Sequence, residues 1–190
     1  MTKLLLVRHG QTDWNVARRH QGQMDVPLNA EGVRQVQELA VRLRQDCFDA
    51  IYSSDLQRAL QTAQILAQGR TLQVITDARL REVSVGEWEG TYVEDNLRAH
   101  PERFTISHTN PSIPLAPGGE STAQVALRTA NFADEISRRF PEGRVVVVAH
   151  GLTLAALICQ VGGIPLTETH KYIPDNAEPI EILWNTDKPI

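Results

Sequence analysis

Two stretches of this chain decide its fold: Leu4-Leu5-Leu6-Val7-Arg8-His9-Gly10 and Val145-Val146-Val147-Val148-Ala149-His150-Gly151. In each, a run of four or five aliphatic residues predicts a strand that is buried on both faces of a parallel sheet. Ligands of such sheets bind just beyond the carboxyl ends of the strands. Each histidine is therefore placed where chemistry is usually done, and each glycine lets the backbone turn sharply beside a ligand. We expect the two His-Gly pairs to meet at one edge of the sheet.

The rest of the chain alternates between strand and helix patterns. Further strands are expected at 48–52, 72–75 and 180–184. Helices are expected at 30–45, from the Ser53-Ser54 start signal to 67, from the Ser121-x-x-Gln124 capping box to 140, and at 152–161. This alternation predicts an α/β fold, a three-layer α/β/α sandwich with a mostly parallel central sheet.

Length and loop composition indicate a single domain spanning 1–190. Residues 81–90 are expected to form a loop that carries glycine and tryptophan. Residues 105–120 hold three prolines and the Gly118-Gly119 pair, which is typical of an ordered excursion rather than a domain linker. We therefore expect a lid-like excursion around 91–120.

Charge and hydropathy exclude several classes of partner. The net charge is −4, and no cluster of basic residues is longer than Arg18-Arg19 or Arg138-Arg139, so no nucleic-acid partner is expected. No apolar stretch reaches the roughly 18–20 residues that cross a bilayer, and the first apolar run is too short for a signal peptide. We expect no membrane partner and a cytoplasmic location.

The chain has two cysteines, Cys47 and Cys159. In a cytoplasmic protein they are expected to be reduced, buried thiols. No cysteine and histidine spacing matches a zinc site. The sequence therefore predicts no metal, and no cofactor motif is present.

The residues at the two strand ends suit phosphoryl chemistry. A neutral imidazole nitrogen of His9 is a good nucleophile toward phosphorus, and the Arg8 guanidinium can hold a phosphate with two parallel hydrogen bonds. Arg58 lies one turn into the helix that follows the second strand, so its side chain can reach the same edge of the sheet. With His150, these residues would form a cationic pocket in an acidic protein. Such a pocket favours unprotonated His9, because nearby positive charge disfavours imidazolium.

The motifs along the chain resemble those of the histidine phosphatase superfamily, in its phosphoglycerate mutase-like branch. The matching blocks, in family order, are Arg8-His9-Gly10-Gln11-Thr12-x-Trp14-Asn15, Gln21-Gly22, Leu28-Asn29-x-x-Gly32, Ser53-Ser54-Asp55-Leu56-x-Arg58-Ala59, Leu80-Arg81-Glu82 with Gly86-x-Trp88-Glu89-Gly90, Pro117-Gly118-Gly119-Glu120-Ser121, and His150-Gly151. They extend over most of the chain.

The resemblance implies a role for each matching residue. His9 is similar to the nucleophile that becomes a phosphohistidine, and Glu82 to the acid that protonates the leaving alcohol and then helps activate water. The groups similar to those that bind the phosphoryl oxygens are Arg8, Asn15, Arg58 and His150. The possible substrate-pocket residues are Gln21, Gly22 and Leu152. The family uses no metal.

Three readings of the function stay open. Phosphatases and cofactor-dependent phosphoglycerate mutases both occur in the family, and an inactive binding or scaffold protein is a third alternative. Mutases carry an aromatic residue before the glycine that matches Gly86, with an Asn-Lys pair nearby, whereas this chain has Val85 there and no such pair. It also has Gln21 where mutases usually show a small residue before the glycine, and it lacks the length that mutases use to cover the site, so a phosphatase is favoured. Its substrate is expected to be a small phosphorylated metabolite: phosphoserine, a sugar phosphate, a phosphoglycerate derivative or α-ribazole phosphate. The protein is expected to be a monomer, or a homodimer paired through an edge strand such as 48–52 or 180–184.

Overall fold

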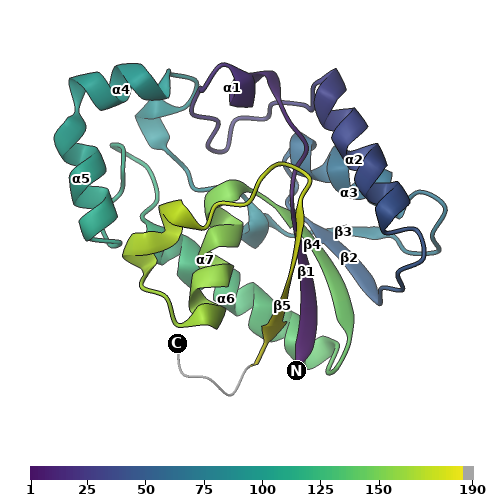
Figure 1. Ribbon diagram of the computed structural model, residues 1–190. Helices are drawn as coiled ribbons and strands as arrows, with labels where there is room; N and C mark the ends of the chain where they lie inside the picture. The colour runs from purple at the N-terminus through teal and green to yellow at the C-terminus, as the bar shows by residue number, and fades with distance from the viewer. Residues whose placement is uncertain (186–190) are drawn as a thin grey trace.

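The centre of the computed structural model, which describes residues 1–185, is a five-stranded sheet (Figure 1). Its strands are β1 (Thr2–Arg8), β2 (Ala50–Ser53), β3 (Val74–Thr76), β4 (Arg144–Ala149) and β5 (Pro179–Trp184). They lie in the order β3-β2-β4-β1-β5. The first four are parallel, and β5 runs antiparallel to β1. The predicted mostly parallel sheet is confirmed.

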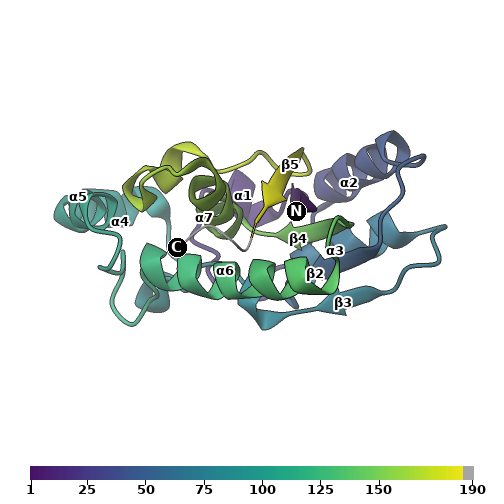
Figure 2. The ribbon, with the colours of Figure 1, turned by 90° about the horizontal axis from the view of Figure 1, so that it is seen from below.

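Helices cover both faces of the sheet, as Figure 2 shows in a view along the strands. On one face lie α2 (Ala30–Arg42) and α3 (Gln57–Ala67); on the other lie α6 (Thr122–Arg139) and α7 (Gly151–Gly162). The three-layer α/β/α sandwich is therefore confirmed. No helix among residues 1–185 is long and apolar enough to cross a membrane.

The register of the central strands places the two His-Gly pairs together. Leu4 and Leu6 of β1 face α6 and α7, whereas Leu5 and Val7 face α2 and α3, which is why the run is apolar at every position. β1 pairs with β4 so that Arg8 lies opposite Ala149. Both strands end at this pair, so the next residues, His9 and His150, lie side by side just beyond the sheet.

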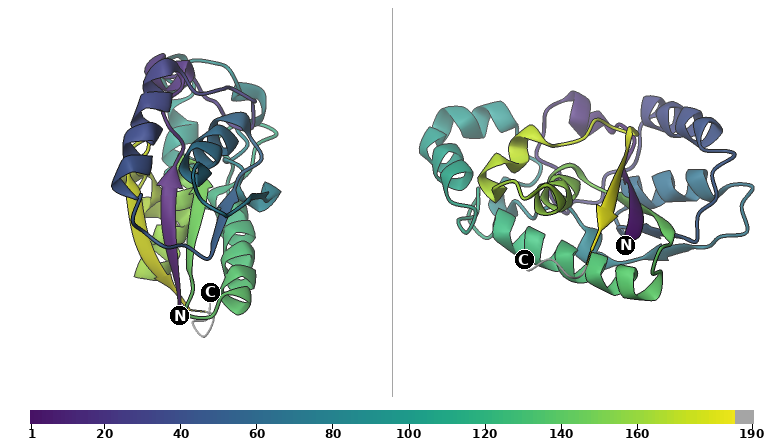
Figure 3. Two further views of the ribbon diagram at one scale, coloured as in Figure 1. Left: turned by 90° about the vertical axis from the view of Figure 1, so that its right-hand side faces the viewer. Right: turned by 60° about the horizontal axis from the view of Figure 1, so that its bottom comes forward.

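Several short helices lie outside the three layers. They are α1 (Asp13–Val16), α4 (Val93–Ala99), α5 (Pro101–Thr109) and the 3₁₀ helices η1 (Ala78–Leu80), η2 (Gly86–Trp88) and η3 (Leu166–Lys171). Figure 3 shows α4 and α5 standing apart from the sheet, beyond α7. They occupy the predicted excursion, but the sequence did not predict them as helices. Neither has a buried residue, so neither has an apolar stripe to reveal it.

Three predictions about local structure are wrong. Ser53 and Ser54 do not begin a helix: Ser53 closes β2, and Ser54 N–H donates to the Val148 carbonyl, so both continue the sheet before α3 starts at Gln57. The stretch 48–52 is no edge, because β2 lies between β3 and β4; among residues 1–185 the edge strands of the sheet are β3 and β5. Cys159 is buried, but Cys47 lies in the turn after α2 and is exposed; both thiols are free.

A close approach near the site makes glycine necessary at Gly32, in the first turn of α2. A Cβ there would overlap the carbonyl oxygen of Gln11, in the loop that follows β1. Alanine normally stabilises a helix interior by about 1 kcal/mol relative to glycine. We predict the opposite here: Gly32→Ala lowers the free energy of unfolding by roughly 1–3 kcal/mol, because the overlap is with backbone.

Gly162 supplies the matched control, since it also lies in a helix. A Cβ at Gly162 would meet only the flexible end of the Ile164 side chain. Gly162→Ala should be neutral or slightly stabilising in urea denaturation. Equal stability of the two variants would contradict the prediction.

Candidate active site

The site lies where β1 and β4 end, beneath α1 in Figure 1. The imidazole rings of His9 and His150 meet there edge to face, with centroids 5.1 Å apart. Both side chains are buried, with exposed fractions of 2% and 0%. The predicted meeting of the two histidines is confirmed.

The hydrogen bond of His9 decides which of its nitrogens can react. Nδ1 lies 2.7 Å from the carbonyl oxygen of Gly10, and since a carbonyl only accepts, Nδ1 carries the proton. Nε2 is then left with its lone pair. The backbone holds the ring in place, because His9 N–H donates to the Ala149 carbonyl and the His9 carbonyl accepts from Asn176 Nδ2. His9 therefore presents a neutral, nucleophilic Nε2.

His150 has the opposite tautomer. Arg58 Nε donates to His150 Nδ1 over 3.1 Å, so Nδ1 is the acceptor and the proton is on Nε2. This Nε2 is buried and has no hydrogen-bond partner among residues 1–185. His150 therefore offers a donor where His9 offers a lone pair.

Arg58 is held in a single orientation. Its Nη1 and Nη2 donate to the carbonyls of Met24 and Gly22, each over 2.7 Å. Gly22 has a φ of +49°, and a Cβ there would overlap the Glu89 side chain, so this turn favours glycine. Burial lowers the pKa of Arg58 to about 10, which still leaves the guanidinium charged at neutral pH.

Arg8 lies against the start of α7. Its Nη1 donates to the Pro174 carbonyl over 2.7 Å, and its Cζ lies 3.6 Å from where a Cβ of Gly151 would be. Its Nε is buried and, like His150 Nε2, has no partner among the described residues. These two buried donors can be satisfied by a bound anion, and phosphoryl oxygens suit both.

Burial and positive charge keep the two imidazoles neutral. Desolvation, and then the charge of Arg58, hold the pKa of His9 well below its usual value; Arg8 adds to the shift. The pKa of His150 is lowered by the same causes, burial first and Arg58 second. The nucleophilic form of His9 is therefore the dominant one at neutral pH.

Glu82 faces the same pocket from the segment between η1 and η2. Its Oε1 accepts from Thr153 N–H (3.3 Å), Thr153 Oγ1 (3.2 Å) and Val83 N–H (3.0 Å), and its Oε2 from Leu152 N–H (3.4 Å). The carboxylate thus lies at the N-terminus of α7, where the helix dipole favours negative charge. It also lies near both guanidiniums: its charge raises the pKa of Arg8 and of Arg58, although burial lowers each by more.

The model of the histidine phosphatase superfamily (branch 1) matches residues 4–190. The chain belongs to this family. Among curated relatives, it is 37% identical to phosphoserine phosphatase 1 of Hydrogenobacter thermophilus, over 93% of this chain and 84% of that protein. It is 40% identical to a probable phosphoglycerate mutase GpmB of Proteus mirabilis, over 87% and 77%.

A solved structure agrees with this assignment. The mycobacterial glucosyl-3-phosphoglycerate phosphatase, in a complex with VO3, superposes with a TM-score of 0.86 at 33% identity and covers 94% of this chain and 91% of that one. At the level of the family, the predicted class of enzyme, a phosphoric monoester hydrolase, is confirmed. Within residues 1–185, no three His, Cys, Asp or Glu side chains gather as metal ligands would.

The other predicted site residues contact either the residues already described or Thr12. Gly22 lends its carbonyl to Arg58, and Leu152 its N–H to Glu82. Asn15 uses its Oδ1 in a capping box with Thr12 at the start of α1, and Thr12 Oγ1 also donates to Gln21 Oε1. The contacts of Asn15 and Gln21 with phosphate or substrate stay predictions.

The sequence did not reveal the residues that hold these groups in place. Gly10 N–H donates to Thr62 Oγ1, Thr153 holds Glu82, and Arg8 is anchored on Pro174. Thr62 and Thr153 follow Arg58 and His150 by four and three positions, so their helical spacing was a usable signal. For Pro174 there was none, because the contact is through its carbonyl.

The buried neutral imidazoles predict a pH-dependent stability. In the unfolded chain a histidine binds a proton below about pH 6.5, whereas His9 stays neutral in the fold, so stability is lost as the pH falls below about 6.5. Between pH 7 and 5.5 His9 should account for about 1 kcal/mol of that loss. Urea titrations of wild type and His9→Asn should show a flatter pH dependence for the variant. Parallel curves would contradict a depressed pKa.

Proposed function

We propose that this chain hydrolyses a small phosphorylated metabolite through a phosphohistidine on His9, with no metal in the reaction. The observation that carries the proposal is the opposite protonation of the two imidazoles. A lone pair on His9 Nε2 lies beside buried donors on His150 and Arg8 for which residues 1–185 offer no acceptor. A phosphate monoester supplies what both sides need, an electrophilic phosphorus and anionic oxygens.

In the first step, His9 Nε2 attacks phosphorus and the ester P–O bond breaks. Glu82, protonated by the monoanionic ester as that ester binds, gives this proton to the leaving oxygen, so the product leaves as a neutral alcohol. Arg8, Arg58 and the Nε2–H of His150 stabilise the charge on the remaining phosphoryl oxygens. Such fixed donors supply most of the catalysis in phosphoryl transfer, where positioning and electrostatics dominate.

In the second step, water replaces the alcohol. Glu82, now a carboxylate, takes a proton from the water as its oxygen attacks phosphorus. The N–P bond breaks, inorganic phosphate forms, and His9 regains its lone pair. Glu82 then passes this proton to the departing phosphate and is again a carboxylate, so each turnover restores the starting state.

The identity of the ester is proposed at the level of its class. Two of the relatives are named for phosphoserine and for glucosyl-3-phosphoglycerate, which are small phosphate esters. We propose that α4 and α5 form the lid over the leaving group, since Trp88 stacks on Phe104 of α5 and on His100 between the two helices, each with ring centroids 5.6 Å apart. A phosphoglycerate mutase is the second candidate, favoured by the GpmB relative.

A metal-free phosphatase should turn over p-nitrophenyl phosphate in the presence of EDTA, at the rate seen without it. His9→Ala should remain folded by circular dichroism and lose roughly a thousandfold or more in kcat, because the proposed nucleophile is removed. Loss of wild-type activity in EDTA, or activity retained by His9→Ala, would contradict the proposal.

The acceptor of the phosphoryl group separates the two candidate activities. With 3-phosphoglycerate and its bisphosphate as primer, a phosphatase releases inorganic phosphate, whereas a mutase forms 2-phosphoglycerate. Phosphorus NMR of the mixture distinguishes them, and we expect inorganic phosphate as the main product. Accumulation of 2-phosphoglycerate would favour the mutase.

A further inference from the structure

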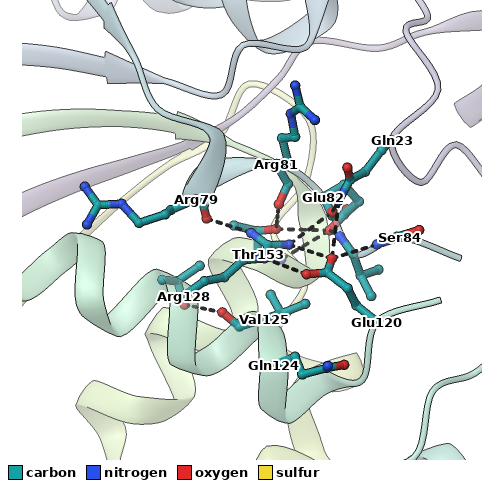
Figure 4. Close-up of polar contacts among 12 residues, drawn as sticks. Gln23, Arg79, Arg81, Glu82, Ser84, Glu120, Gln124, Val125, Arg128 and Thr153 are labelled. Atoms are coloured by element: carbon teal, nitrogen blue, oxygen red, sulfur yellow. Dashed lines mark hydrogen bonds and ion pairs between the residues drawn. The ribbon is translucent and has the colours of Figure 1, made fainter.

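The Pro117–Ser121 block has no part in the two chemical steps, yet its Glu120 lies directly behind the segment that carries Glu82 (Figure 4). The Glu120 carboxylate accepts from Ser84 N–H over 2.9 Å and from Gln23 Nε2 over 3.4 Å. It also forms an ion pair with Arg128 of α6, with Nε to Oε1 at 3.0 Å and Nη2 to Oε2 at 3.1 Å. Glu120 thus joins three separate parts of the chain.

Arg128 reaches from this ion pair to the backbone beside Glu82. Its Nη1 donates to the Arg79 carbonyl over 2.6 Å, and its Nη2 to the Glu82 carbonyl over 3.1 Å. Gln23 Nε2 donates to the same Glu82 carbonyl over 3.2 Å. Two side chains from distant segments therefore hold the backbone of the residue that carries the acid.

This support matters because Glu82 lies outside regular secondary structure. It follows η1 and precedes η2, so no helix or sheet hydrogen bonds fix its carbonyl. A general acid must reach the leaving oxygen within hydrogen-bond distance, and displacement by about 1 Å costs much of its effect. The orientation of Glu82 therefore depends on the side chains that hold its backbone as well as on the α7 groups that hold its carboxylate.

The donors of Arg128 leave no role for it as a substrate ligand. Nε, Nη1 and Nη2 are all engaged with Glu120 or with backbone carbonyls, and the side chain is only 17% exposed. Its charge is paired with Glu120, although it still acts at a distance on His150, where it helps to lower the pKa. Its hydrogen bonds instead hold the backbone at Arg79 and Glu82 in place.

We propose that Arg128 is a positioning residue for the general acid Glu82. Arg128, Glu120 and Gln23 together form the frame that holds the backbone of Glu82. The inference rests on the proposed function, in which Glu82 protonates the leaving alcohol. It assigns to the Pro117–Ser121 block the task of orienting the acid. Loss of the frame should therefore impair proton donation more than phosphate binding or nucleophilic attack.

The basicity of the leaving group separates these effects. p-Nitrophenolate leaves without help from an acid, whereas the alcohol of benzyl phosphate needs a proton as it leaves. For both esters, kcat/KM reports formation of the phosphohistidine, and the later hydrolysis is common to the two. The ratio of the two kcat/KM values therefore measures how well the acid is placed.

For Arg128→Gln, kcat/KM for benzyl phosphate should fall by roughly thirtyfold, part of the hundredfold or more that a general acid contributes. The value for p-nitrophenyl phosphate should fall by less than about threefold. Arg128→Lys, which keeps the charge but cannot reach all three acceptors at once, should lie between wild type and Arg128→Gln. Glu82→Gln provides the reference for a lost acid, with a larger change in the same ratio.

Gln23→Met keeps the ion pair between Arg128 and Glu120 but removes the amide that donates to the Glu82 carbonyl and to the Glu120 carboxylate. It should show a smaller selective loss for benzyl phosphate, about fivefold, and it tests the frame if Arg128→Gln fails to fold. Arg70→Gln is the matched control, because Arg70 also donates to backbone carbonyls, those of Leu43, Asp46 and Leu66, but far from the site. It should leave the ratio unchanged.

Each outcome separates the inference from the function on which it rests. If Glu82→Gln changes the ratio but Arg128→Gln and Gln23→Met lower both substrates equally or not at all, the positioning role is overturned and the phosphatase stands. If Glu82→Gln itself leaves the ratio unchanged, Glu82 is not the acid, and both proposals fall. A shift of the ratio in Arg70→Gln would also overturn the inference, since a general loss of stability would then explain it.

Discussion

The hydrogen bond from Arg58 Nε to His150 Nδ1 is the contact on which the rest of the site depends. It places a proton on His150 Nε2 and so turns a second potential nucleophile into a donor for an anion. It holds only because the other two nitrogens of the guanidinium are tied to the Met24 and Gly22 carbonyls. A buried charge is costly unless it is fully hydrogen-bonded, so the loop that supplies these carbonyls is as necessary as the arginine itself.

The same charge acts on His9 through space. Imidazolium is disfavoured next to Arg58 and Arg8, and burial adds to the effect, so the pKa of His9 lies well below its usual value. Two fixed guanidiniums therefore do two things at once: they prepare the nucleophile in its reactive form, and they provide the positive charge that phosphoryl oxygens need. Glu82, held at the N-terminus of α7, brings a negative charge that partly offsets the positive charges of Arg8 and Arg58.

The features that could be predicted from the sequence are those that a local pattern of residues determines. Uninterrupted apolar runs identified β1 and β4, and their parallel pairing follows from the fold class, so the meeting of His9 and His150 was foreseeable. The exposure of Cys47 and the sheet bonds of Ser54 were not, because tertiary contacts decided both. The helices α4 and α5 have no buried residue, and without an apolar stripe a helix leaves little trace in a single sequence.

The contacts that hold the backbone of Glu82 could not be predicted from the sequence, for a different reason. Arg128 lies on the polar side of an otherwise ordinary amphipathic helix, and its acceptors include the backbone carbonyls of Arg79 and Glu82, which any residue type would offer. When a side chain donates to a backbone carbonyl, the acceptor position needs no particular residue type, so the sequence carries no sign of the contact. Sequence motifs therefore identify the groups that react, whereas the groups that orient them become visible only when α6 is packed against the sheet. In this fold the two sets meet at Glu82, whose carboxylate is held by α7 and whose backbone is held by α6.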